Sequence, residues 1–298
     1  MTDLRGGAAA ARRRGAGSGR TALLLDGLGA RYPGMLAALG AHPAVRETFV
    51  EAAGPLGRVT ADGLAGLDSP GSLTDTAGAQ LALLIAGVAG GRAAMAASGP
   101  PPAVVGCGVG AFAAGVLAGV LRLDEAIGLV HLQARRTARL FPAGGGMVRV
   151  SGLLPEHATR LAERIAVVAG PLWVARVDGP QDSVLAGTAR ALEAVRDHAA
   201  AAGAHRVERL EGAPPAHGPA LRPVASELAS ALVRLPDRRP AFPCAGSVTG
   251  ALLWTSSAVR ADLALSVART VRWHDAMAGL RAAGIEPLTP VLPATIRA

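Results

Sequence analysis

Apolar positions in this chain fall into short runs typical of buried strands and longer runs typical of helices. Residues 21–25 read TALLL and are expected to form a buried strand, whereas residues 80–95 form an almost uninterrupted apolar helix. A helix with acidic residues in its first turn follows from 123 to about 140, and residues 62–75 are Gly-rich and irregular. The pattern indicates a chain of mixed helices and strands.

The pattern changes after residue 142, where three glycines interrupt the chain. Strands are expected at 147–151, 172–177, 183–186 and 206–210, with helices at 156–168 and 189–202. This β-α-β-β-α-β order is the ferredoxin-like pattern. We therefore expect residues 143–210 to form a subdomain inserted into a larger core made of residues 20–142 and 211–298. Beyond it we expect a helix at 221–235, a strand near 242, a hairpin around 249–250 and a helix through 272–283.

The stretch 103–121 reads as a short strand, a turn with three alternate glycines, and a helix. Gly106, Gly108 and Gly110 allow a sharp bend, and the helix that follows would direct its unpaired N–H groups toward an anion or an oxyanion. Three interpretations fit this pattern: a nucleophile elbow, Gly-x-Ser-x-Gly, in which position 108 lacks the serine; a dinucleotide loop, Gly-x-Gly-x-x-Ala; or glycines that only permit close packing.

Composition narrows the possible partners. Half of the residues are hydrophobic but only 3% are aromatic, so the core must consist mainly of Ala, Val and Leu. The formal charge is +8, every basic residue is Arg, and several of these lie within the first twenty residues. We expect residues 1–19 to be a disordered tail, and without interleaved aromatic and basic residues in the body we expect no nucleic-acid binding.

The two cysteines, Cys107 and Cys244, are far apart in apolar surroundings, which predicts neither a disulfide framework nor a metal site. The apolar run 103–121 is long enough to cross a membrane, but its glycine-rich turn favours a buried core segment. A cytoplasmic protein without membrane or metal binding is therefore expected. Cys107 is expected to be a small buried residue whose side chain points away from any pocket.

The order of these elements resembles the malonyl-CoA:acyl-carrier-protein transacylase family from about residue 21 to the end. The resemblance is carried by DGLGARYPGM at 26–35, the elbow with AAG at 113–115, AIGLV at 126–130, GGM at 145–147, PAH at 215–217 and VRW at 271–273. Within the family the chain looks most like the acyltransferase (epsilon) subunit of malonate decarboxylase. That likeness is carried by QLALLIAGV at 80–88, VGAFAA at 109–114 and VRWHD at 271–275.

The resemblance implies an α/β-hydrolase-like acyltransferase core with an inserted ferredoxin-like α+β subdomain. It implies no bound cofactor, with a CoA thioester and the pantetheine-type arm of an acyl carrier protein as substrates. The carrier protein, and other malonate decarboxylase subunits, are the implied partners. In the family a serine on the elbow takes the acyl group, a histidine acts as general base and backbone N–H groups hold the oxyanion.

Carried over to this sequence, the base position is His217 and the nucleophile position is Gly108, which offers no oxygen or sulfur. The substrate-binding positions are Leu28, Val109 and Gln133, and Gln133 stands where the family has an arginine that binds the malonyl carboxylate. The family's C-terminal Gly-Pro-Gly loop is reduced to Leu-Pro-Ala at 292–294, and the asparagine before Gly-Pro in the subdomain is Asp178.

Two functions are compatible with these departures. The chain is either an acyltransferase whose covalent step is impaired, with a degenerate active site, or a non-catalytic module that docks a carrier protein or a partner enzyme. Nicotinamide binding is disfavoured because the acidic residues about twenty positions after the glycines open a helix instead of closing a second strand.

Overall fold

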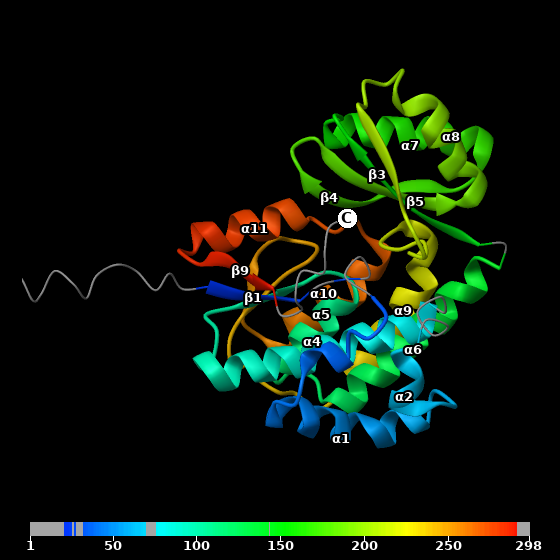
Figure 1. Ribbon diagram of the computed structural model, residues 1–298. Helices are drawn as coiled ribbons and strands as arrows, with labels where there is room; N and C mark the ends of the chain where they lie inside the picture. Colours follow the sequence, from blue (N-terminus) through cyan, green and yellow to red (C-terminus); the bar gives the residue numbers. More distant parts are fainter. Residues whose placement is uncertain (1–20, 26, 28–31, 70–75, 143, 291–298) are drawn as a thin grey trace, which may run out of the picture.

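The computed structural model describes residues 21–25, 27, 32–69, 76–142 and 144–290. In these residues the chain builds two sheets, each with its own helices (Figure 1). The expected tail over 1–19, the position Leu28 and the segment 292–294 lie outside the described residues.

The larger part is organised by a five-stranded sheet with the order β8-β7-β2-β1-β9. Its strands are β1 (Thr21–Leu25), β2 (Val104–Gly106), β7 (Cys244–Ala245), β8 (Leu252–Leu253) and β9 (Glu286–Pro290). Strand β1 pairs in parallel with both β2 and β9, β2 pairs in parallel with β7, and only β8 is antiparallel. Parallel neighbours require long crossover connections, which the helices supply.

Helices cover both faces of this sheet. They are α1 (Pro43–Gly57), α2 (Gly63–Leu67), α4 (Thr76–Ser98), α5 (Val109–Leu117), α6 (Leu123–Leu140), α9 (Arg222–Val233), α10 (Ser256–Ala268) and α11 (Trp273–Ala282), with 3-10 turns η3 (Ala37–Leu39) and η4 (Pro219–Leu221). Successive strand residues face opposite sides: Leu23 and Leu25 pack into the main core with α4 and α5, and Ala22 packs with α11.

The second sheet is antiparallel throughout, with the order β4-β5-β3-β6. It contains β3 (Gly145–Ser151), β4 (Leu172–Gly179), β5 (Asp182–Thr188) and β6 (Arg206–Leu210), and α7 (Pro155–Ala169) and α8 (Ala189–Ala199) lie on its outer face (Figure 1). The predicted fold class, an α/β core with an inserted ferredoxin-like subdomain, is confirmed.

Helix α4 is the one described helix that is long and apolar enough to cross a membrane, over Ala77–Ser98. Residues 78–91 of it are all buried, and it packs against α1, α5 and α6. Burial within the protein core therefore accounts for the apolar character of α4.

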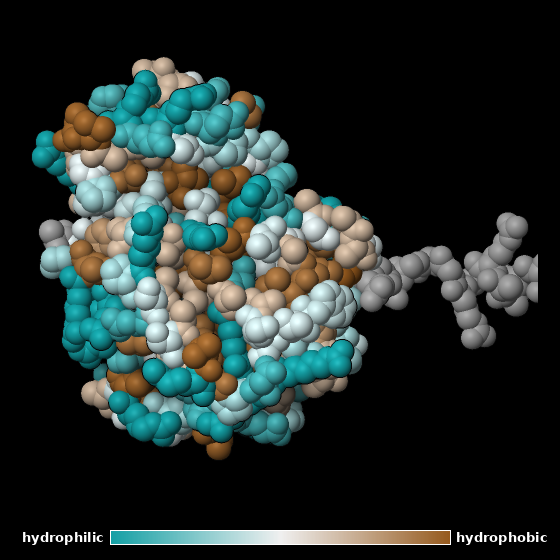
Figure 2. All heavy atoms as spheres, turned by 180° about the vertical axis from the view of Figure 1, so that it is seen from behind, coloured by the Kyte–Doolittle hydropathy of each residue, from teal (hydrophilic) through white to brown (hydrophobic). Residues whose placement is uncertain are grey.

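On the face shown in Figure 2, hydrophobic residues form separate patches with hydrophilic residues between them.

Candidate active site

The turn between β2 and α5 consists of only two residues, Cys107 and Gly108. Gly108 has φ 58° and ψ −120°, a left-handed conformation that costs a residue with a side chain about 1–3 kcal/mol. A Cβ on Gly106 would collide with the backbone of Gly110, so strand and helix approach this closely only with glycine there. This sharp strand–turn–helix bend is the geometry of a nucleophile elbow.

His217 faces the elbow from the loop between β6 and η4. The residue is only 8% exposed, and its backbone has φ 55°, which is uncommon for a side chain of this size. Its Nδ1 lies 2.6 Å from the carbonyl oxygen of Ser266 in α10. Because a carbonyl oxygen only accepts, Nδ1 carries the proton and donates it, which leaves Nε2 as the acceptor.

The acceptor nitrogen of His217 points at the empty side of Gly108. A Cβ built on Gly108 would lie 3.6 Å from Nε2, and the nearest atoms to it within 4 Å all belong to the His217 ring. A hydroxyl on that Cβ would come within hydrogen-bonding reach of the imidazole. The structure therefore brings together the two predicted catalytic positions, a base and the place of a nucleophile, with no nucleophilic atom at the second.

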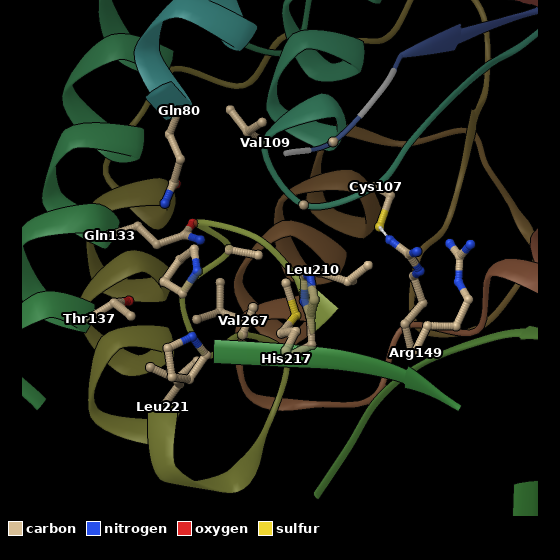
Figure 3. Close-up of a pocket in the computed structure, with 18 of the residues that line it drawn as sticks. Gln80, Cys107, Val109, Gln133, Thr137, Arg149, Leu210, His217, Leu221 and Val267 are labelled. Atoms are coloured by element: carbon tan, nitrogen blue, oxygen red, sulfur yellow. Dashed lines mark hydrogen bonds between the residues drawn. The ribbon is translucent and has the colours of Figure 1, made fainter. Parts of the chain in front are cut away.

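Cys107 does not point away from the site, so that expectation was wrong. The residue lines the cavity (Figure 3), and Nη1 of Arg176 in β4 donates to its Sγ across 3.6 Å. Sequence reasoning placed the side chain by its distance from position 108 alone. It missed Arg176, because a strand in the inserted subdomain brings that arginine to the elbow.

Arg176 belongs to a small charged cluster. Its Nε and Nη2 donate to the two oxygens of Asp178 at 2.5 and 2.8 Å, and Nη2 of Arg149 lies 3.5 Å from Asp178 Oδ2. Two guanidinium groups thus share one carboxylate. One positive charge is left over, and it stands beside Cys107.

This cluster alters the acidity of the thiol. Burial, the largest single influence, raises the pKa of Cys107, but the charge of Arg176 together with the neighbouring imidazole of His217 outweighs it, and the pKa is lowered. The pKa of Arg176 is in turn raised by Cys107 and Asp178, in spite of its burial. Cys244 has no such neighbours, and burial raises its pKa to about 12.

A cavity of about 460 Å³ lies between the two sheets and contains this site. The sequence-predicted positions Val109 and Gln133 both line it, whereas Leu28 lies outside the described residues. Val109 is the first residue of α5, a position at which the backbone N–H has no intrahelical partner. At the opposite end from the charged cluster stand Gln80, Gln133 and Thr137 (Figure 3).

Helix α10 was not predicted from the sequence. It nevertheless contacts the site, because its Ser266 carbonyl oxygen holds the ring of His217. Besides the Ser266 carbonyl, it supplies Asp262, whose carboxylate accepts from the N–H groups of Ser247 and Val248 at 2.8 and 2.9 Å. The signal that could have revealed it is Thr255, which caps the helix by accepting from Ala258 N.

Comparisons with known proteins agree with this geometry. Residues 27–290 match the family model described as the acyl transferase domain. The chain is 31% identical to the malonyl CoA-acyl carrier protein transacylase of Salmonella typhimurium over 284 residues, which is 92% of this chain and 89% of that protein. It is also 32% identical to polyketide synthase GfsB of Streptomyces halstedii, over 93% of this chain but only 5% of that protein.

Solved structures show the same relationship. The malonyl CoA-acyl carrier protein transacylase of Coxiella burnetii has a TM-score of 0.83 at 29% identity, covering 92% of this chain and 87% of that chain. A malonyl-transacylase in complex with a type II polyketide synthase acyl-carrier protein has a TM-score of 0.83 at 30% identity, covering 92% and 89%.

Proposed function

The chain belongs to the acyl transferase domain family, and from this premise we propose that it binds acyl thioesters of CoA and of an acyl carrier protein but is impaired in acyl transfer. Its fold and its general base are of the malonyl-CoA:acyl-carrier-protein transacylase type. The step that forms an ester on the elbow cannot take place, because position 108 is glycine. By analogy with other nucleophile deletions, the loss is on the order of 10⁶ in rate.

The observation that carries this proposal is the distance of 3.6 Å between His217 Nε2 and the position of a Cβ on Gly108. The base is held by Ser266 in the orientation that deprotonation of an elbow residue requires. The base is therefore in place, and the missing side chain at position 108 removes the covalent step.

The acyl end of the cavity favours a small acyl group without a carboxylate. Gln133 stands where an arginine is expected from the resemblance, and its Oε1 is buried without a hydrogen-bond partner among the described residues. A neutral amide replaces a charge-assisted bidentate contact that is worth a few kcal/mol. We propose that a malonyl group is bound less well here than an acetyl group.

We further propose that the partner system is malonate decarboxylase-like, with other subunits of such a system as partners beside the carrier protein. This rests on the sequence blocks at 80–88, 109–114 and 271–275. The alternative is a purely non-catalytic docking module. It is favoured by the same glycine, which removes the nucleophile but leaves the cavity between the two sheets open.

Labelled malonyl-CoA and acetyl-CoA, offered together with acyl carrier protein, test the proposal. We expect calorimetric binding of acyl-CoA and of carrier protein, with transfer far below that of Gly108→Ser. Wild-type transfer as fast as that of the serine variant would overturn the impairment, and absence of binding would overturn the proposed function. Carrier-protein binding with no transfer at all would favour the docking module.

A further inference from the structure

We propose that the thiol of Cys107 is an acyl acceptor, which takes an acyl group from a CoA thioester and holds it as a protein thioester. This inference rests on the proposed function, since it requires an acyl-CoA in the cleft. It differs from the elbow chemistry of the resemblance, because the accepting atom belongs to the residue before the elbow position.

The first support is the position of the thiol. Cys107 lines the same cavity as His217, one residue from the glycine whose missing side chain leaves space beside the imidazole. An acyl carbonyl that enters this space lies between the imidazole and the wall that carries Sγ. A side chain at 108 would occupy that space, so the glycine that prevents an ester at 108 opens an approach to the neighbouring sulfur.

The second support is the charge around the sulfur. The groups that face it are the guanidinium of Arg176 at 3.6 Å and the imidazole of His217, with Asp178 and Arg149 behind Arg176. Asp178 neutralises only one of the two arginines. A thiolate at Cys107 would neutralise the remaining charge, and thiolates, not thiols, attack thioesters. The lowered pKa of Cys107 agrees with this arrangement.

The third support lies at the other end of the cavity and points to a ligand independently of the sulfur. Gln133 Oε1 is buried without a partner among the described residues, and Gln80, only 4% exposed, directs its amide toward the cavity beside it (Figure 3). Buried polar groups in proteins are almost always hydrogen-bonded. An acyl group with a polar atom, or a pantetheine amide, would give Gln133 Oε1 a hydrogen-bond partner while its thioester lies near Cys107.

The exchange conserves bonds and charge. The Cys107 sulfur forms a bond to the acyl carbon, the bond from that carbon to the CoA sulfur breaks, and the electron pair leaves with the CoA sulfur. His217 accepts the thiol proton and returns it to the departing CoA thiolate. One thioester replaces another, so no oxidant or other co-reactant is needed, and a carrier-protein thiol can remove the acyl group by the same exchange.

The second cysteine of the chain provides a matched control. Cys244 is also buried and unpaired, but it lies on β7, outside the cavity wall, with a pKa raised to about 12. Full-length protein is incubated with acetyl-CoA or malonyl-CoA, and intact mass and peptide mapping locate any adduct. Neutral hydroxylamine then distinguishes a thioester from a more stable ester.

We expect a hydroxylamine-labile adduct on the wild type and on Cys244→Ala, and none on Cys107→Ala. Since Cys107→Ala can fail to fold, a second measurement uses the wild type alone: pre-incubation with acetyl-CoA should protect Cys107, but not Cys244, from iodoacetamide. An adduct that persists on folded Cys107→Ala, or unprotected Cys107 in protein that binds acyl-CoA by calorimetry, overturns the inference. Absence of acyl-CoA binding overturns the proposed function on which the inference rests. The binding measurement therefore distinguishes failure of the proposed function from failure of the Cys107 inference.

Discussion

The Nε2 atom of His217 lies 3.6 Å from the point at which Gly108 would carry a Cβ, and the other ring nitrogen is held by the carbonyl oxygen of Ser266. The imidazole is thus aligned with an elbow that has no side chain at its central position. The elbow also keeps the left-handed backbone of a nucleophile position, although glycine does not require it. The expectations below follow from this alignment and from the charges around it.

Gly108→Ser should make residue 108 itself an acyl acceptor, because the new hydroxyl would lie next to the free nitrogen of His217. We expect a hydroxylamine-resistant ester at residue 108 after incubation with acetyl-CoA, detected by mass spectrometry. The left-handed backbone should lower the free energy of unfolding by about 1–3 kcal/mol. Gly108→Ala, with the same strain and no hydroxyl, is the control, and His217→Ala in the serine background should slow ester formation. Ester formation unaffected by His217→Ala would contradict the assigned base.

Gln133→Arg in the Gly108→Ser background should shift acyl preference from acetyl toward malonyl. A guanidinium at this position restores a charge-assisted contact to a carboxylate, worth about 1.5–3 kcal/mol, or roughly tenfold or more in relative rate. Competition between the two CoA esters, read as the ratio of adduct masses, measures the effect. A ratio unchanged in a folded double variant would show that the carboxylate is bound elsewhere, for example by Arg149.

Arg176→Gln should move the pH profile of Cys107 alkylation to higher pH. Removing this charge removes an influence that lowers the thiol pKa and leaves burial, which raises it. At neutral pH the thiolate fraction, and with it the iodoacetamide rate, should fall. Arg149→Gln, which removes a charge from the same cluster but no described hydrogen bond to Cys107, should move the profile less than Arg176→Gln does. Equal pH profiles for wild type and Arg176→Gln would show that Arg176 does not lower the pKa of Cys107.

Asp262→Asn should change how stability depends on pH. Burial raises the pKa of Asp262, so the native state keeps this proton at a pH where the unfolded chain has lost it. Its contribution to stability is full below about pH 3.9 and falls as the pH rises through the raised pKa. The stability of wild type relative to the asparagine variant, measured by urea unfolding, should therefore decline across that window. A constant difference would show that the carboxyl titrates normally.

Gly218→Ala should destabilise the loop that carries His217. An added Cβ there would collide with the indole of Trp173, whose Nε1 donates to the carbonyl oxygen of Ala216 at 2.9 Å. We expect a loss of about 1–3 kcal/mol in the free energy of unfolding. Gly128→Ala is the matched control, because nothing lies within 4 Å of its Cβ and it is inside helix α6. That variant should be neutral or stabilised by up to about 1 kcal/mol.

The elements with one buried face were predictable, because their period is visible in the sequence. The helix Pro155–Ala169, which buries Ala158, Leu161, Ala162 and Ile165 on one face, appears within a residue or two of its expected bounds. Helix α10 was missed because its buried face includes the polar residues Ser256, Asp262 and Ser266, so the sequence shows no clean apolar stripe.

Within the site, position 108 and His217 could be found from local motifs, since each is marked by neighbouring glycine or proline. The orientation of Cys107 could not. Its sulfur contacts Arg176, which is 69 positions away on strand β4 of the inserted subdomain. Local spacing contains no information about such a contact.

The left-handed backbone of His217 has a consequence of its own. A loop that only joined a strand to the next helix would be less strained with glycine or asparagine at position 217, because both tolerate a φ of 55° far better than histidine does. Holding an imidazole there stores conformational energy of about 1–3 kcal/mol. The contact with Ser266 and the burial of the ring offset that cost and keep the other ring nitrogen toward the cleft, although position 108 offers it no hydroxyl.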